Sequence, residues 1–327
     1  MEDNTTNNNA NIPRNAGKQK KKKQDPNIKK SIKFLNTNAQ SLQYKISELA
    51  AKLNHEEIQI AGITESWGQE WNEDTLSIKG YQDYRKNRKD GRRGGGCILY
   101  VSEDLKSHPC RELQNMPGDD SVWCWIKPGK EARILVGCIY RSTSSTTENN
   151  ELLMQKIVKA CEVADQNRIL LMGDYNVGEI NWAENEVIGG PRSLSFIFNE
   201  CIKVCFLYQH VMEPTRFRNQ QESTLDLIFT KEEEDVKNID IDFPLGRSDH
   251  ATVKGEFVCE WKVNTVFTPK RLYHKADYDV INGLINEINW EVEFEDKNVH
   301  QKWTFFKNKL DEIVTQKVPM SEPRQYY

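Results

Sequence analysis

A short motif in the middle of the chain combines residue types that can act on a phosphate or an ester. The apolar run 168–172 is typical of a buried strand, and it stops at Gly173. Asp174 and Asn176 follow two residues apart, where α/β sheets usually place their chemistry. A carboxylate there can hold or activate a water, and the Asn176 amide can donate to a developing negative oxygen. The same pattern is also common in plain turns, because Asp and Asn satisfy nearby backbone groups.

Other predicted strands also end in polar residues. In chain order the set is Asn38, Glu65, Tyr140, Asp174, Asn176, Asp226, Asp249 and His250. Scattered acids with one histidine and no cysteine ligand suit Mg²⁺, with Mn²⁺ as a substitute, better than Zn²⁺. Such a set around a phosphate-sized space indicates phosphodiester hydrolysis. Taken singly, Glu65 is either a surface acid or a metal ligand, and its place at a strand end favours the ligand.

The elements that must position these residues alternate along the chain. Strands are expected at 32–35, 58–63, 97–101, 122–126, 134–140, 168–172, 223–229, 236–243 and 252–258, with helices at 42–53, 148–164 and 193–204. The strands 122–126 and 134–140 are expected to pair antiparallel through a turn at Pro128-Gly129. This alternation predicts an α/β sandwich with one active-site edge.

A basic stretch from Tyr81 to Arg93 is expected to form a loop before the strand that begins at Cys97. Six bases crowd into nine residues: Arg85, Lys86, Arg88, Lys89, Arg92 and Arg93. On a loop they make a good surface for contacting the phosphate backbone of a nucleic acid. The plainer alternative is a solvated loop.

The formal net charge of −4 conceals a basic front end. Residues 1–30 carry a net charge of +5, which leaves −9 for the rest of the chain. Residues 1–29 are rich in Asn, Thr and Lys and have little to bury, so they are predicted to be a disordered basic tail. Lys20 to Lys23 are either a nuclear import signal or part of a solvated low-complexity tail.

The cysteine pattern and the hydropathy argue for an intracellular protein. Eight cysteines lie mostly inside apolar runs, and none forms a Cys-x-x-Cys pair. We therefore expect buried free thiols in a reducing compartment rather than a zinc knuckle or a disulfide framework. Neither a run of about 18 apolar residues nor a secretory signal is present, so no membrane partner is expected.

The character of the chain changes near residue 260. Residues 30–260 are expected to form the α/β domain, and residues 261–327 a linker followed by a helical extension. Helices are expected at about 277–288 and 299–314. In the second, Trp303, Phe306, Leu310 and Ile313 share one face, so this helix is predicted to pack against something.

The motifs, taken in order, resemble the endonuclease/exonuclease/phosphatase superfamily, which includes DNase I and the apurinic/apyrimidinic endonucleases. Within it, they are most similar to the endonuclease domain of non-LTR retrotransposons such as jockey-like elements. The resemblance spans about residues 31–258. It rests on Thr37-Asn38-Ala39-Gln40-Ser41-Leu42, Ile63-Thr64-Glu65-Ser66-Trp67, Arg92-Arg93-Gly94-Gly95-Gly96, Ile139-Tyr140-Arg141, Gly173-Asp174-Tyr175-Asn176, Ser223-Thr224-Leu225-Asp226 and Ser248-Asp249-His250. It implies a DNase I-like fold, a four-layer α/β sandwich of two packed mixed β-sheets flanked by helices.

The resemblance also implies roles around a Mg²⁺ ion. Glu65 matches the principal ligand, with Asn38 and Asp249 close to the ion. Asp174 matches the residue that orients or deprotonates the attacking water, and Asn176 is expected to steady the phosphate oxygens.

Further roles concern the substrate. His250 matches a phosphate-contacting histidine polarised by Asp226, and Tyr140 matches a phosphate-side hydroxyl. Thr215 matches a substrate-contacting threonine of retroelement members. Gln40 departs from the pattern, because abasic-site repair enzymes carry an acid two residues after the matching Asn. This departure weakens an assignment to abasic-site repair.

The end of the chain carries a second resemblance. Residues 273–319 are similar to the segment between endonuclease and reverse transcriptase in retrotransposon polyproteins, yet no Tyr-x-Asp-Asp or Phe-Ala-Asp-Asp motif occurs. We therefore expect a truncated element or a host gene derived from one.

The expected activity is a Mg²⁺-dependent DNA endonuclease that nicks one strand and leaves a 3′-hydroxyl for priming reverse transcription. DNA is the expected partner, together with element RNA or a reverse transcriptase supplied separately, and the expected location is the nucleus, or the cytoplasm before import. Two alternatives stay open. One is a phosphomonoesterase or phospholipase of the same fold, and the other is a domesticated module that binds nucleic acid without catalysis.

Overall fold

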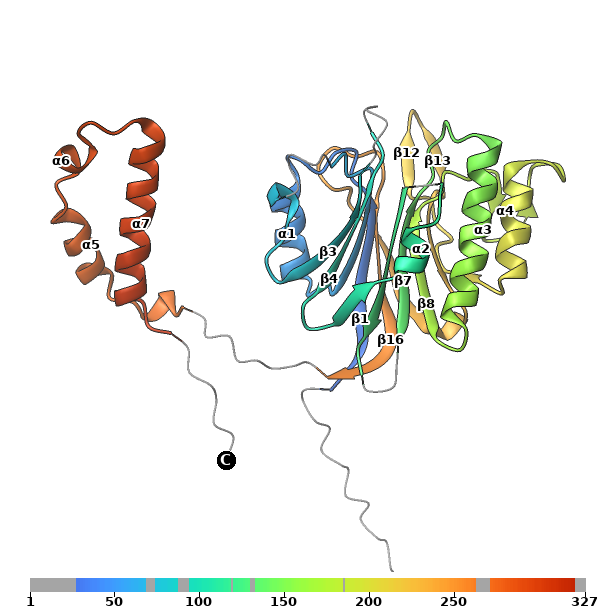
Figure 1. Ribbon diagram of the computed structural model, residues 1–327, viewed down its shortest axis with the longest axis horizontal. Coiled ribbons are helices and arrows are strands. Elements are labelled where there is room, and N and C mark those ends of the chain that lie inside the picture. The colour runs from blue at the N-terminus through green and yellow to red at the C-terminus, as the bar shows by residue number, and fades with distance from the viewer. Residues whose placement is uncertain are drawn as a thin grey trace, which may run out of the picture. The chain divides into compact units, whose positions relative to one another are not determined.

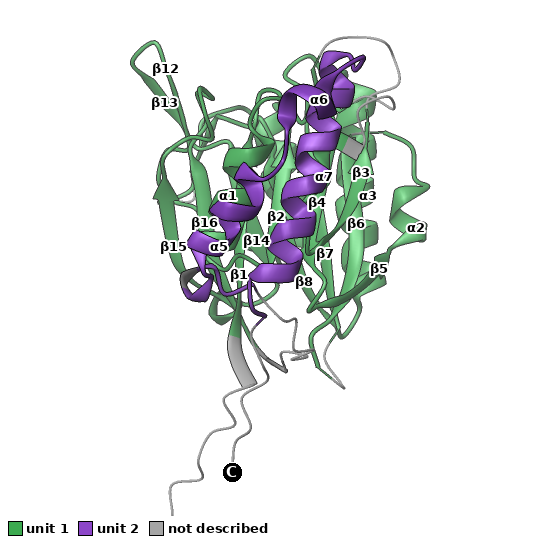
Figure 2. Ribbon diagram, turned by 90° about the vertical axis from the view of Figure 1, so that its left-hand side faces the viewer, with its two compact units in different colours: residues 1–263 green, residues 264–327 purple. Residues whose placement is uncertain are grey.

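A computed structural model describes residues 28–68, 74–87, 94–118, 120–129, 133–184, 186–262 and 271–320. The chain divides into two compact units, Met1–Val263 and Asn264–Tyr327, which Figure 2 colours separately. Lys20 to Lys23 and four of the six predicted DNA-binding bases, Arg88, Lys89, Arg92 and Arg93, lie outside the described residues. Within the described part, no helix is long and apolar enough to cross a membrane.

Two six-stranded mixed sheets form the centre of the first unit (Figure 1). Sheet A has the order β15-β16-β1-β2-β4-β3, and sheet B has the order β11-β14-β8-β7-β6-β5. The strands of sheet A are β1 Ile28–Asn38, β2 Ile60–Thr64, β3 Tyr81–Lys86, β4 Cys97–Ser102, β15 Val236–Asp242 and β16 Thr252–Lys262. Those of sheet B are β5 Lys106–Pro109, β6 Asp120–Lys127, β7 Ile134–Tyr140, β8 Arg168–Asp174, β11 Tyr208–Gln209 and β14 Asp226–Thr230.

Helices cover the outer faces of both sheets, which gives the predicted four layers (Figure 1). The helices are α1 Ile46–His55, α2 Arg111–Gln114, α3 Thr147–Ala164 and α4 Leu194–Val204. Leu49 and Leu53 of α1 pack on the outer face of sheet A against Tyr100, while Ile157 of α3 and Phe198 of α4 pack on sheet B. A third apolar cluster fills the space between the sheets. The predicted DNase I-like sandwich is therefore confirmed.

Each sheet contains one parallel pair whose carboxyl ends lead toward the same edge. In sheet A, β1 runs parallel to β2 and Asn38 lies opposite Thr64. In sheet B, β7 runs parallel to β8 and Tyr140 lies opposite Asp174. The strands β6 and β7 pair antiparallel, as predicted. The polar residues that follow these strands are thus brought to one end of the sandwich.

The predicted loop from Tyr81 to Arg93 was wrong in its first half. Residues Tyr81–Lys86 form β3, an edge strand that pairs antiparallel with β4 over six residues. Tyr84 enters the core between the sheets, and Tyr81 packs toward the α1 layer on the opposite side. The charged residues between these aromatics concealed the period-two alternation of a strand.

Two small hairpins complete the first unit. β9 Ile180–Asn181 pairs with β10 Glu186–Val187, and β12 Arg216–Arg218 pairs with β13 Gln221–Ser223. The β12–β13 hairpin turns through Asn219 and Gln220, both with positive φ, and it projects beyond the sheets in Figures 1 and 2. It was not predicted.

The described part of the second unit contains the α-helices α5 Tyr278–Asn286, α6 Trp290–Phe294 and α7 Val299–Lys317. Ile281, Ile313 and Val318 form its small buried core. Asn298 and Gln301 cap the start of α7 in a reciprocal capping box. On α7, Trp303 stacks on Phe306 with ring centroids 5.8 Å apart, but the Trp303 side chain stays 56% exposed.

Candidate active site

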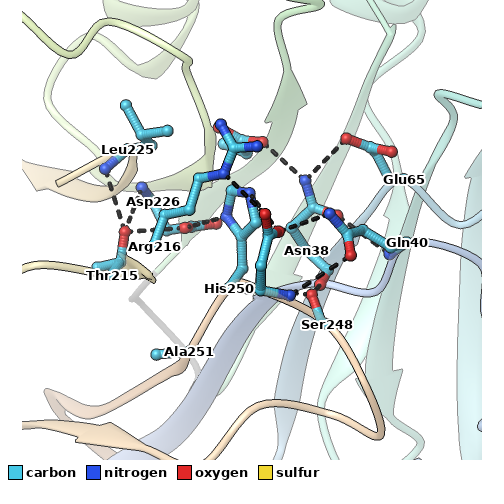
Figure 3. A network of polar contacts seen from close by, with 12 residues as sticks. Asn38, Gln40, Glu65, Thr215, Arg216, Leu225, Asp226, Ser248, His250 and Ala251 are labelled. Carbon is cyan, nitrogen blue, oxygen red and sulfur yellow. Dashed lines mark hydrogen bonds and ion pairs between the residues drawn. The ribbon is translucent and has the colours of Figure 1, made fainter. Parts of the chain in front are cut away.

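The residues predicted to carry the chemistry meet at the edge of the sandwich where both sheets end (Figure 3). Gly173 fixes the end of β8, because a Cβ atom there would lie 1.9 Å from the carbonyl oxygen of Ile139 on β7. Its φ of +151° is also one that other residues rarely adopt. Only glycine lets β7 and β8 approach closely enough to set Tyr140 beside Asp174.

One amide links acids from the two sheets. The Asn38 Nδ2 atom donates to Glu65 Oε1 at 3.0 Å and to Asp174 Oδ2 at 2.7 Å. Asn38 and Glu65 belong to sheet A and its following loop, whereas Asp174 ends β8 of sheet B. The Trp67 indole donates to the other Glu65 oxygen at 3.2 Å. A single buried side chain therefore holds two carboxylates near each other across the sandwich.

Asp174 is completely buried and is held by a second amide. Asn176 donates to Asp174 Oδ2 from its side chain at 3.0 Å and to Oδ1 from its backbone at 3.1 Å. Burial and the charge of Asp226 raise the pKa of Asp174 to about 7, against the opposing effects of His250 and Asn38. A group whose pKa lies near neutrality is suited to accept a proton from water.

Arg141, which the sequence did not single out as functional, locks the loop that carries Asn176. The Asn176 amide donates to the Arg141 carbonyl at 2.8 Å, and Arg141 Nη1 donates to the Asn176 carbonyl at 3.1 Å. Asn150 on α3 receives Arg141 Nε at 2.8 Å. Arg141 is a positioning residue. Its signals in the sequence are its place in the Ile139-Tyr140-Arg141 motif and its charge directly after an apolar strand.

The predicted Asp226–His250 pair is present. Asp226 Oδ2 and His250 Nδ1 are 2.7 Å apart, and both residues are buried. Asp226 begins β14 and His250 precedes β16, and these two strands lie in different sheets. The bond therefore crosses the sandwich, as the Asn38–Asp174 bond does. Burial lowers the pKa of His250, but the charge and hydrogen bond of Asp226 outweigh it and raise the pKa to about 9.

Thr215 stands behind this pair, which corrects its predicted role as a substrate contact. Its side chain is fully buried. The hydroxyl donates to Asp226 Oδ2 at 2.9 Å and accepts the backbone N–H groups of Leu225 and Asp226 at 3.1 and 3.0 Å. A hydroxyl used in this way orients Asp226 and has no surface from which to reach DNA.

Asp249 lies in a separate set of contacts beside His250. Gln40 donates to Asp249 Oδ1 at 2.6 Å, and Arg216 donates to Oδ2 at 3.2 Å. His250 Nε2 lies 3.7 Å from Asp249 Oδ1. Ser248 ties the same loop to β1 by donating to the Asn38 carbonyl at 2.7 Å. Gln40, which stands where abasic-site repair enzymes carry an acid, thus donates a hydrogen bond to Asp249 and adds no negative charge.

Backbone strain concentrates around these residues. Gln40, Glu65, Trp67 and Asn176 all adopt positive φ, at 42°, 47°, 54° and 49°. Such conformations cost free energy for residues other than glycine and persist where the surroundings over-determine them. In this chain, the hydrogen bonds from Asn38 to Glu65 and Asp174, and from Gln40 to Asp249, hold the backbone in these conformations.

A divalent cation fits the acids at this edge. Among the described residues, Asp174, Asp226 and His250 bring ligand atoms within 4.8 Å of one another. The Oδ1 atom of Asp226 is buried without a hydrogen-bond partner. Glu65 joins this group only through Asn38, whose amide nitrogen rather than oxygen faces both carboxylates.

The donor chemistry selects among these ligands. Asn38 Oδ1 accepts from the Gln40 backbone at 3.1 Å, and Asp249 is paired with Arg216, whereas Asp226 Oδ1 has no hydrogen-bond partner. A histidine must be neutral to bind metal, and Asp226 favours protonated His250. Carboxylate oxygens of Glu65, Asp174 and Asp226 are the donors that suit a hard cation best.

The remaining predicted residues have mixed outcomes. Tyr140 is buried at the edge of the core between the sheets, beside Asp174 in the strand register. Arg85 was predicted to bind DNA, but its side chain is only 10% exposed and it pairs with Asp83 at 2.5 Å. It also donates to Ser77 at 2.9 Å. Arg85 therefore stabilises β3, while Lys86 stays a predicted DNA contact.

The two packed sheets with this shared edge define the class of fold, which is DNase I-like. Residues 134–254 match the family described as endonuclease-reverse transcriptase. No curated protein sequence matches the chain.

Solved structures carry the same fold. The endonuclease domain of TRAS1, a telomere-specific non-LTR retrotransposon, is 17% identical with a TM-score of 0.57, covering 70% of this chain and 98% of that one. The AP endonuclease LMAP from Leishmania major is 14% identical with a TM-score of 0.58, covering 70% and 88%. The catalytic domain of Xenopus laevis APE2 is 13% identical with a TM-score of 0.53, covering 72% and 94%.

Proposed function

We propose that this protein is a Mg²⁺-dependent DNA endonuclease that hydrolyses one phosphodiester bond and leaves a 3′-hydroxyl, as target-primed reverse transcription of a non-LTR retrotransposon requires. The observation that carries the proposal is the pair of hydrogen bonds that cross the sandwich, Asn38 to Asp174 and Asp226 to His250. They set a carboxylate of raised pKa and a histidine that favours its protonated form at one edge.

Each residue has a defined task in this proposal. Asp174 accepts a proton from the attacking water, and Asn176 and Asn38 hold its carboxylate in place. Protonated His250, which Asp226 holds through Nδ1, presents Nε2 as a donor to a phosphate oxygen. A bound Mg²⁺ ion would supply charge that stabilises the phosphate in the transition state. The clustered carboxylates of Asp174 and Asp226 would hold it together with Glu65, which Asn38 links to Asp174.

The choice of DNA over a phosphomonoester is supported by the β12–β13 hairpin. Arg216 connects the hairpin to Asp249, and the Phe217 N–H donates to the Asp249 carbonyl at 2.9 Å. Phe217 is 48% exposed and Arg218 is also exposed. A projecting aromatic and a cation next to the site suit an extended polyanion better than a small phosphate. TRAS1, by its description, is the endonuclease of a retrotransposon, which agrees with this choice.

A supercoiled-plasmid assay tests the proposal. We expect nicked circles with Mg²⁺ or Mn²⁺, none with EDTA, and extension of the nick by a polymerase without prior end repair. Glu65→Gln should lower the rate about 100-fold or more at limiting Mg²⁺, because it removes a charged ligand. Hydrolysis of a phosphomonoester or phospholipid in place of nicking would favour the alternative enzyme. DNA binding without turnover would favour the non-catalytic module.

The expected location and partners extend the same proposal. We propose a nuclear protein whose import depends on Lys20 to Lys23, and a reverse transcriptase or element RNA as the partner that uses the nick. Replacing the four lysines with Gln in a fluorescent fusion tests the first point, since an unchanged nuclear fraction would contradict it.

A further inference from the structure

Three of the eight cysteines are not buried, contrary to the expectation from the sequence. Cys161 ends the inner face of α3, and Cys201 and Cys205 lie one turn apart at the end of α4. All three are half-buried against the outer core of sheet B. The Cys205 side chain interacts with those of both other cysteines, so the three thiols form one cluster.

The cluster opens to solvent through a hollow of about 430 Å³ between the ends of α3 and α4. Cys161 and Cys205 line it together with the apolar Val158 and Val204. Lys231 adds a cation, and Glu162 and Glu232 add two acids. A small molecule that carries both carboxylates and an ammonium group therefore meets charges of both signs beside two accessible sulfurs.

The arrangement makes Cys205 the nucleophile of the three. The interactions with the Cys161 thiol and, to a smaller degree, with the Cys201 thiol lower the pKa of Cys205, which favours its thiolate. The same contacts raise the pKa values of the Cys161 and Cys201 thiols. Since the thiolate is the reactive form of cysteine, Cys205 should react before its neighbours.

Geometry selects which thiol can then form a bond with Cys205. Cys201 and Cys205 are four residues apart, and Cβ atoms at that spacing on a helix lie about 5–6 Å from each other. A disulfide needs Cβ atoms about 3.5–4.5 Å apart. Cys201 is also held toward the Met154 carbonyl at 3.7 Å. Cys161, on a separate helix, has no such restriction and can approach Cys205 by side-chain rotation.

We propose that Cys161, Cys201 and Cys205 form a thiol modification site that reacts with a small disulfide of the glutathione type and closes into a Cys161–Cys205 disulfide. In the first step the Cys205 thiolate bonds to one sulfur of the small disulfide and expels the other half as a thiolate. In the second, Cys161 loses its proton to solvent, attacks the Cys205 sulfur and expels the second half. Two protein thiols are oxidised, and the small disulfide is reduced to two thiols.

Cysteine variants of the full chain test the site with glutathione disulfide as the reagent. After acid quenching and digestion without reductant, mass spectrometry should find a Cys161–Cys205 link in the wild type. Cys161→Ser should retain one glutathione adduct on Cys205, because the resolving thiol is absent. Cys205→Ser should form neither product at this site, and Cys201→Ser should still form the link but more slowly.

The buried Cys124 and Cys138 serve as internal controls and should stay unmodified while the protein is folded. Circular dichroism of each variant shows whether it is folded, and a link that raises the melting temperature of the wild type is expected. The proposal is overturned if Cys205 reacts no faster than the other half-buried cysteines, or if Cys161→Ser traps no adduct. Modification only in urea would likewise overturn it. None of these outcomes depends on nuclease activity.

Discussion

At the scale of single residues, the site works by sharing a few polar groups among several partners. One amide nitrogen of Asn38 serves two carboxylates, and one oxygen of Asp226 serves both His250 and Thr215. Removing one member therefore leaves another buried and unsatisfied, which costs more than the lost hydrogen bond alone. Mutational effects at this edge should consequently be strongly coupled.

The Asp226–His250 pair gives the first prediction. His250→Ala and Asp226→Asn should each lower the nicking rate by about 10²-fold or more, since each removes the oriented donor. The double variant should be no slower than the worse single variant, because the two residues act as a unit.

Single-turnover nicking at saturating Mg²⁺ measures these losses, with melting temperatures to check folding. His210→Gln is the matched control, because His210 is half-buried and, like His250, hydrogen-bonded to a side chain of sheet B, Thr230, but lies outside the site. If the two losses multiply in the double variant, the pair is not coupled.

The sequence allowed the identity of most site residues to be predicted, but not the direction in which they face. The Asp226–His250 contact was predicted correctly, but the sequence did not show that it joins opposite sheets. The amide orientation of Asn38 and the burial of Thr215 depend on groups more than ten residues away in sequence. Residue types alone carry no information on such long-range partners.

At the scale of elements, Gly173 connects the strand geometry to the site. Gly173→Ala should lower the free energy of unfolding by more than about 3 kcal/mol, because the new methyl group overlaps the Ile139 carbonyl and cannot rotate away. Urea unfolding measures this loss. Gly190→Ala is the control, since a Cβ atom there meets nothing within 4 Å. Equal stability of the two variants would contradict the close approach of β7 and β8.

The β12–β13 hairpin is predicted to contact DNA. Phe217→Ala should weaken DNA binding several-fold, since an exposed aromatic side chain contributes by stacking, and Arg218→Gln should reduce the slope of log K against log salt by about 1. Fluorescence anisotropy over a range of salt concentrations measures both. Phe206→Ala is the control, because Phe206 is 84% exposed but follows α4 rather than the hairpin. Unchanged binding in both hairpin variants would rule out this contact.

Long apolar elements were predictable, whereas short polar ones were not. The helix over 148–164 and the strand over 134–140 agree with α3 and β7 because their apolar periods are uninterrupted. β3 and the β12–β13 hairpin contain many charged or polar residues. They are strands because a neighbouring strand supplies their hydrogen bonds, which a local pattern does not record.

At the scale of the whole first unit, an ionic network joins α1 to the edge of sheet A. Lys254 on β16 contacts Asp242 at 2.8 Å and Glu56 at 3.0 Å, and Lys52 contacts Asp242 at 2.6 Å. Burial raises the pKa of Asp242, but the hydrogen bonds from both lysines outweigh it and lower the pKa well below its usual range. The Lys254 pKa is raised, because the acids outweigh burial.

These shifts predict how stability changes with pH. A carboxylate whose pKa is lowered stabilises the fold above a pH of about 4, and this stabilisation is lost as the pH falls further. A lysine whose pKa is raised stabilises the fold below a pH of about 10. Lys254→Met should therefore cost about 1–2 kcal/mol near pH 7 and progressively less toward pH 2. Urea unfolding at several pH values measures this. Lys203→Met, which breaks the exposed Lys203–Glu200 pair, should change stability by less than about 0.5 kcal/mol at any pH.

The strands of sheet A lie both before and after those of sheet B in the sequence, which affects the order in which the sheets can form during synthesis. Ser31 on β1 bonds Glu256 on β16, a partner 225 residues later in the chain. At typical rates of protein synthesis, roughly 10–50 s separate the appearance of these two strands on the ribosome. Sheet B, from residue 106 to 230, is complete in the nascent chain before sheet A can close around β1. His250 emerges only at the end of this interval, so a prematurely terminated chain would be released without a finished cutting site.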